Sequence, residues 1–240
     1  MLPIGDQNEP WHGPALVTWA LIAVNVGVFL LLQGAGTDET FTYGWSAIPL
    51  EITTGHDLVQ PQPWMVGSQT FAVPQAPGPA PIQLTLLSSM FMHADWLHLG
   101  GNMLFLWIFG DNVEHRAGRP LYLVAYLGAG LVGALAQILS TPDSPIPTLG
   151  ASGAISGVLG AYLVLFPGNR VTAIIFRFIT QVPAVVAIGM WIAFQVIASL
   201  AADPTAGGVA YLAHIGGFAA GLVAGVVFRL MPARRPPQRR

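Results

Sequence analysis

Two side chains that could carry out nucleophilic catalysis lie in apolar stretches of the sequence. Ser152 stands in the segment Gly-Ala-Ser-Gly, and His214 stands near the start of a run that contains Gly217 and Gly221. A serine hydroxyl becomes an effective nucleophile when a neighbouring imidazole accepts its proton. If both stretches are membrane helices, the pair indicates acyl-transfer chemistry within a bilayer, where polar side chains are costly and usually mark function.

The residues around Ser152 predict the beginning of a helix. Gly150 and Gly153 flank the serine, and an apolar run follows them. The N–H groups at a helix N-terminus are unpaired and partly positive, so the backbone N–H of Ser152 is a candidate donor to an oxyanion. The two glycines would let a substrate backbone approach. The alternative is close helix packing, because Gly153 and Gly157 form a GxxxG pair.

A second polar cluster precedes another apolar run and contains His93, Asp95, His98 and Asn102. His98 and Asn102 are four residues apart and share one helix face. A neutral imidazole and an amide there could donate hydrogen bonds to a tetrahedral oxyanion, or could only join helices by hydrogen bonds. A metal site would need three or four ligands, and the candidates besides His98 would be His93, Asp95 and His214. The sequence has no HExxH-type helix, so we expect no metal and no other cofactor.

The spacing of the glycines suggests how Ser152 and His214 could meet. Small residues recur on the segment after each of them, at Gly153, Gly157 and Gly160 and at Gly217, Gly221 and Gly225. Small residues let helix backbones approach closely. If the two glycine seams are in contact, Ser152 and His214 come within reach of one hydrogen bond. No third acidic residue is evident, so we predict a Ser–His dyad.

The composition indicates a membrane protein. Of 240 residues, 53% are hydrophobic and 8% are charged, whereas soluble domains carry roughly 25% charged residues. Several apolar runs approach the roughly 20 residues that a helix needs to cross a bilayer. We predict an all-α polytopic bundle of six transmembrane helices at residues 15–33, 97–113, 121–140, 149–166, 182–201 and 209–231. The chain has no cysteine, which excludes disulfides and thiolate catalysis.

These spans define one membrane domain at residues 15–231, with a short N-terminal segment at 1–14 and a basic tail at 232–240. The first apolar run is expected to be a retained helix, because no Lys or Arg precedes it. A long first loop at 34–90 contains aromatic residues that suit the membrane interface. Its central part, 60–81, could equally be disordered.

The basic residues predict the orientation of the bundle. All nine are arginines, and all follow the second, fourth or sixth span: Arg116, Arg119, Arg170, Arg177, Arg229, Arg234, Arg235, Arg239 and Arg240. Positive residues near helix ends are retained in the cytoplasm. We therefore expect both termini inside and Ser152 and His214 near the outer face. The arginine-rich, lysine-free composition favours a bacterial inner membrane.

Four motifs between residues 85 and 225 resemble the rhomboid family of intramembrane serine proteases. They are Phe91-Met-His-Ala-Asp-Trp-Leu-His-Leu-Gly-Gly-Asn, Val113-Glu-His-Arg-Ala-Gly, Gly150-Ala-Ser-Gly, and Ala213-His with Gly217 and Gly221. The resemblance implies Ser152 as nucleophile, His214 as general base, and His98 with Asn102 as oxyanion donors. It also implies a six-helix core with a water-filled cavity that opens outward.

On this resemblance, the partners are single-span or polytopic membrane-protein substrates, cleaved near the outer ends of their transmembrane segments, and the lipid bilayer, with no nucleic acid. Trp191 would then belong to a lateral substrate gate or simply face lipid. Ser156 departs from the family, because a tyrosine often stands there and packs on the catalytic histidine. The alternatives are a catalytically inactive rhomboid-like binding factor and a channel for small polar solutes.

Overall fold

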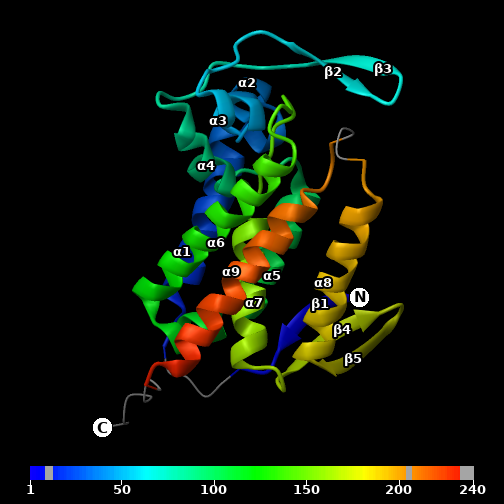
Figure 1. Cartoon of the computed structure of the whole chain (residues 1–240). Helices are drawn as coiled ribbons and strands as arrows, with labels where there is room; N and C mark the ends of the chain where they lie inside the picture. The colour runs from blue at the N-terminus through cyan, green and yellow to red at the C-terminus, as the bar shows by residue number, and fades with distance from the viewer. Residues whose placement is uncertain (9–12, 204–206, 233–240) are drawn as a thin grey trace.

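The computed structural model describes residues 1–8, 13–203 and 207–232, in which long helices form a bundle with a folded cap at one end (Figure 1). A long helical segment occupies each of the six ranges predicted as spans. They are α1 (Leu16–Gly27) with its π-helical continuation η1 (Val28–Leu32), α5 (Trp96–Ala117), α6 (Arg119–Ser140), α7 (Ser152–Leu165), α8 (Ala184–Ala201) and α9 (Tyr211–Leu230). Helix α7 packs against α5, α6 and α9.

Three of these helices, α6, α8 and α9, are long and apolar enough to cross a membrane by length and composition. The segments Leu16–Leu32 and Ser152–Leu165 are apolar but shorter. Helix α5 is long but carries Asp111, Glu114 and Arg116 toward its C-terminal end. The number of six crossings therefore stays a prediction.

The prediction of an all-α protein is wrong, because the described residues also form β-structure. Strands β1 (Leu2–Asp6), β4 (Arg170–Ile175) and β5 (Phe178–Pro183) form an antiparallel sheet in the order β1-β4-β5. The β-branched and aromatic residues of β4 and β5 favour extended structure. In the sequence, the apolar residues of β4 and β5 adjoin a predicted span. The other partner of β4, strand β1, lies near the N-terminus, so local periodicity cannot predict that β1 pairs with β4.

The segment predicted as a long loop at 34–90 forms a series of short elements at the end of the bundle that holds Ser152 (Figure 1). These are η2 (Gly34–Gly36), α2 (Glu39–Trp45), α3 (Pro49–Thr54), the hairpin β2 (Gln62–Val66) and β3 (Gln69–Val73), η3 (Ile82–Leu84), α4 (Thr85–Ser88) and η4 (Ser89–Phe91). A β-bridge between Ala47 and Thr148 joins this cap to the segment before α7. Part of the segment 60–81, for which the sequence allowed disorder, thus forms the β2–β3 hairpin.

The glycine seams of α7 and α9 are in contact, as their spacing predicts. A Cβ atom added to Gly217 would overlap the backbone of Gly153, and one added to Gly221 would overlap the backbone of Gly157. No side chain larger than hydrogen fits at either position without moving a helix. This close packing keeps the backbones of α7 and α9 in direct contact at these positions.

The opposite end of the bundle is tied together by residues at the end of α5. The Glu114 carboxylate accepts hydrogen bonds from the Val17 and Thr18 backbone N–H groups at the start of α1, at 3.1 and 2.7 Å. Arg116 donates to the carbonyl of Arg229 in the last turn of α9 and to that of Met231 directly after the helix. The arginines of the described residues belong to the end of α5, the start of α6, β4 and its turn, and the end of α9, which lie at this end of the bundle (Figure 1). Of the predicted tail, residues 233–240 lie outside the described part of the chain.

Candidate active site

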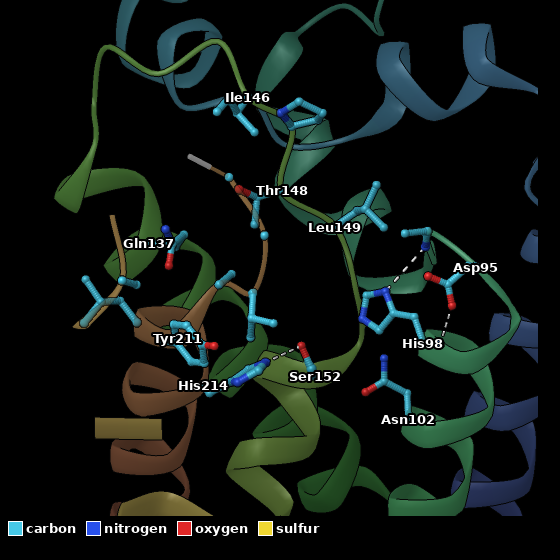
Figure 2. A pocket seen from close by; sticks show the side chains of 18 of the residues that line it. Asp95, His98, Asn102, Gln137, Ile146, Thr148, Leu149, Ser152, Tyr211 and His214 are labelled. Atoms are coloured by element: carbon cyan, nitrogen blue, oxygen red, sulfur yellow. Dashed lines mark hydrogen bonds between the residues drawn. The ribbon is translucent and has the colours of Figure 1, made fainter. Parts of the chain in front are cut away.

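Ser152 and His214 are in direct contact at the end of the bundle covered by the cap. Ser152 is the first residue of α7, and His214 lies one turn into α9. The Oγ atom of Ser152 is 2.8 Å from Nε2 of His214, as the dashed line in Figure 2 shows. Both atoms face a shared cavity, and the imidazole is largely buried. The helix begins three residues later than the predicted span, so Ser152 stands at its N-terminus.

Gly150 shapes the approach to Ser152. Its φ angle of +133° lies in a region that residues with a Cβ atom rarely adopt. Its N–H donates to the carbonyl of Ser89 at 2.8 Å. A Cβ atom at this position would stand 2.9 Å from the His98 ring. Glycine is therefore needed both for the backbone conformation and for the close approach of His98.

The structure brings His98 and Asn102 to the side of Ser152 away from His214 (Figure 2). The backbone N–H of Ala94 donates to Nδ1 of His98 at 3.4 Å, so the proton of a neutral ring is on Nε2. Nδ2 of Asn102 is buried and has no hydrogen-bond partner among the described residues. Such unpaired buried donors are uncommon and call for an explanation. A substrate oxygen beside Ser152 would supply the missing acceptor.

His93 and Asp95 both contact His98. The His93 ring packs edge-on against the His98 ring with centroids 5.1 Å apart. Asp95 caps α5 by accepting the His98 backbone N–H at 2.8 Å. In the described part of the chain, no group of three or more His, Asp or Glu side chains is placed to hold a metal ion.

Two residues of α8 position His214, and the sequence did not identify their contacts. Oε1 of Gln195 is 2.8 Å from Nδ1 of His214. The Trp191 ring lies against the imidazole, with 5.9 Å between the ring centroids and an angle of 36° between the ring planes. Trp191 therefore packs on His214, and its place in a lateral gate stays a prediction. The signal in the sequence is Gln195 itself, the one amide side chain in the mostly apolar helix α8.

Ser156 has a role different from the tyrosine that often stands at this position. Its Oγ atom donates to the carbonyl of Ser152 at 2.6 Å, one turn back along α7. This internal hydrogen bond satisfies the hydroxyl within the helix. Support for His214 thus comes from α8, through Trp191 and Gln195.

The cavity has a volume of about 950 Å³. Its wall combines Ser152, His214, His98 and Asn102 with other residues: Tyr43 of the cap, Thr148 before α7 and Tyr211 at the start of α9. Pockets of roughly 300 to 1,000 Å³ are typical of ligand-binding sites. The cavity beside Ser152 and His214 is therefore large enough to be a binding site.

Comparisons with known proteins give one consistent result. A sequence model of the Rhomboid domain matches residues 83–230. The yeast (Saccharomyces cerevisiae) "Rhomboid protein 1, mitochondrial" is 32% identical over 152 residues, which cover 60% of this chain and 41% of that protein. The Bacillus subtilis "Rhomboid protease GluP" is 42% identical over 85 residues, 35% of this chain and 16% of that protein.

A human relative extends the comparison. "Presenilin-associated rhomboid-like protein, mitochondrial" is 34% identical over 93 residues, which cover 38% of this chain and 24% of that protein. The matched region thus spans less than half the length of each of these three relatives. The match to the Rhomboid domain, at residues 83–230, contains the five helices α5 to α9.

Proposed function

Because the chain belongs to the rhomboid family, we propose that it is a serine endopeptidase that hydrolyses peptide bonds in or near transmembrane segments of other proteins. The 2.8 Å contact between Ser152 Oγ and His214 Nε2 is the observation that carries this proposal. It joins a nucleophile to a base beside a cavity of about 950 Å³. Family membership and the apolar helices make the chain a membrane protein.

In the first step, Ser152 Oγ attacks the scissile carbonyl carbon while its proton moves to Nε2 of His214. The carbonyl becomes a tetrahedral oxyanion, and the oxygen accepts hydrogen bonds from Nε2–H of His98, Nδ2–H of Asn102 and the Ser152 backbone N–H. The protonated imidazole then gives its proton to the departing amine. A peptide bond is broken and an ester to Ser152 remains.

In the second step, water attacks this ester, with His214 again acting as the base. The imidazole accepts a proton from water and returns one to Ser152 Oγ, so the enzyme is regenerated and a carboxylic acid product leaves. Throughout, Nδ1–H of His214 donates a hydrogen bond to the Gln195 amide oxygen. Gln195 is thus a positioning residue, which acts on the substrate only through His214.

The proposed setting is a bilayer crossed by six helices, with both termini cytoplasmic and the cavity opening outward. The arginines of the described residues lie at the end opposite Ser152, which supports this orientation. The proposed substrates are single-span or polytopic membrane proteins. Two of the relatives above carry "mitochondrial" in their names, so a bacterial inner membrane is likewise a proposal, resting on composition.

An activity-based label tests the proposal against an inactive relative or a channel. A fluorophosphonate should modify the wild-type protein covalently and should not modify Ser152→Ala or His214→Ala. Ser156→Ala is the matched control, because it removes a hydroxyl from the same helix that bonds only to a backbone carbonyl; it should be labelled like wild type. In proteoliposomes, Ser152→Ala and His214→Ala should lose cleavage of a transmembrane substrate, and Ser156→Ala should retain it. Equal labelling of wild type and Ser152→Ala would contradict a serine nucleophile.

A further inference from the structure

The hairpin of β4 and β5 exposes a cluster of large apolar side chains at its tip. Phe176 is 97% exposed, Phe178 64% and Ile179 69%. Scattered exposed apolar residues are ordinary, but a contiguous group of them marks an interaction site. We call residues 176–179 the finger. Nothing in the mechanism proposed above uses it.

Turn geometry gives no reason for phenylalanine at the first position of the finger. Phe176 and Arg177 form the two-residue connection between the paired residues Ile175 and Phe178. Phe176 has φ +56°, in the left-handed region that favours Gly, Asn or Asp in such turns. A bulky aromatic ring there is held in a costly conformation while contributing almost nothing to the core.

The rest of the sheet holds the finger in place. Strand β4 lies between β1 and β5, and its Val171 and Ala173 side chains are fully buried. At the base of the hairpin, the Ala184 N–H donates to the carbonyl of Asn169 at 2.8 Å. The tip is therefore presented by an anchored hairpin at a defined position relative to the helices.

That position is the boundary of the apolar helix surface. Strand β5 ends at Pro183 and continues directly into α8, which is apolar enough to cross a membrane. Figure 1 shows the hairpin extending sideways beyond the lower part of α8, across the direction of the helix axes. In the first turn of α8, Val185 and Val186 are exposed as well. The finger thus lies where the lipid-facing surface of α8 begins.

The positive charge of the β4–β5 hairpin favours an anionic partner. Residues 170–183 contain two arginines and no acidic residue. The Arg177 guanidinium carbon lies 5.5 Å from the centroid of the Phe178 ring. Aromatic rings favour the level of the lipid headgroups, and basic residues close to a membrane surface are attracted to anionic lipids. A neighbouring arginine and aromatic pair therefore matches an anionic lipid interface in both respects.

We propose that the finger inserts Phe176 and Phe178 into the headgroup region of the adjoining leaflet, with Arg177 on anionic headgroups. The hairpin is then a second membrane contact for α8, the helix that carries Gln195 and Trp191. The inference depends on the membrane setting of the helices and is independent of catalysis by Ser152.

Single-cysteine labelling tests this cleanly, because the chain contains no cysteine. Phe176→Cys labelled with the fluorophore NBD is reconstituted into vesicles of phosphatidylcholine, with or without phosphatidylglycerol. Two matched sites are labelled in parallel: Asn8→Cys, an exposed polar position after β1, and Val223→Cys, an exposed apolar position on α9. Aqueous iodide and lipids carrying a nitroxide at two depths serve as quenchers.

The label at 176 should have blue-shifted emission, be shielded from iodide, and be quenched most by the shallow nitroxide. The label at 8 should be open to iodide, and the label at 223 should be quenched most by the deep nitroxide. Phosphatidylglycerol should increase the shielding at 176, and adding Arg177→Glu should remove that increase. Iodide access at 176 equal to that at 8 would overturn the proposal, as would insertion that does not respond to phosphatidylglycerol. Shielding in native membranes but not in pure lipid would assign the finger to a protein partner instead.

Discussion

Gln195 Oε1 lies 2.8 Å from Nδ1 of His214, on the far side of the imidazole from Ser152. An amide oxygen can only accept a hydrogen bond, so this contact places the proton of a neutral ring on Nδ1. The lone pair is then on Nε2, the nitrogen that faces the serine hydroxyl. A neutral residue on a neighbouring helix thus selects the tautomer that a Ser–His dyad requires.

Replacing Gln195 with methionine should lower kcat by about tenfold, with little change in KM. Methionine preserves most of the volume but lacks the amide oxygen, so it removes one hydrogen bond worth roughly 1 to 1.5 kcal/mol. His214 would then populate the unproductive tautomer as well. Steady-state kinetics on a transmembrane substrate in proteoliposomes would separate the two constants.

The conservative variant distinguishes this positioning role from a packing role. Gln195→Glu keeps an oxygen acceptor at the same distance and should retain more activity than Gln195→Met. Thermal unfolding of both variants in detergent monitors the fold. A kcat loss that follows the fall in stability, without regard to the acceptor, would indicate that Gln195 only packs between α8 and α9.

Asn102→Leu should reduce kcat by about 10²- to 10³-fold, the range observed when one oxyanion donor is removed. Nδ2 of Asn102 is buried and has no partner in the described structure, which destabilises the folded state. Leucine removes this unpaired donor. We therefore expect unfolding stability to be unchanged or slightly higher. Parallel kinetic and thermal measurements would reveal this opposite pair of effects. A fall in both would make Asn102 a structural hydrogen-bonding residue between helices.

The sequence alone identifies the family and the four polar residues beside the cavity, because their motifs lie within short apolar segments. Ser152 in Gly-Ala-Ser-Gly and Asn102 four residues after His98 are visible as local patterns. The domain match confirms the family resemblance. The catalytic roles of these residues stay a proposal that the variants above would test.

What the sequence could not provide depends on contacts between distant segments. Gln195 lies outside every motif, and only the packing of α8 on α9 brings its amide to His214. The sheet was missed for the same reason, since β1 pairs with a strand more than 160 residues later. Periodicity describes one element at a time, so it detects neither kind of partner.

Glu51 should make the stability of the cap depend on pH. Its carboxylate is buried in α3, and burial, with a smaller contribution from Asp57, raises the pKa from 4.5 to about 7 despite a hydrogen bond from the Leu58 N–H. Between these two values the folded state binds more protons than the unfolded state, so stability decreases as pH rises.

Glu51→Gln keeps the oxygen that accepts from Leu58 but cannot ionise. Its unfolding temperature should therefore lose most of the decline that wild type shows between about pH 4.5 and about pH 7. Glu39→Gln, at an exposed position of α2, is the control and should keep the wild-type profile. Identical profiles for wild type and Glu51→Gln would show that this carboxyl does not control the cap.

Gly217→Ala tests whether the glycine seam sets the distance between Ser152 and His214. The added methyl group would overlap the backbone of Gly153, so α9 must move away from α7, at a cost of about 1 to 3 kcal/mol for overpacking. Since His214 lies one turn before Gly217, its imidazole moves with the helix, and both fluorophosphonate labelling and unfolding temperature should fall. Gly128→Ala on α6 is the matched control, because a Cβ there meets nothing within 4 Å. Normal labelling by Gly217→Ala would contradict the role of the glycine seam in setting the distance between Ser152 and His214.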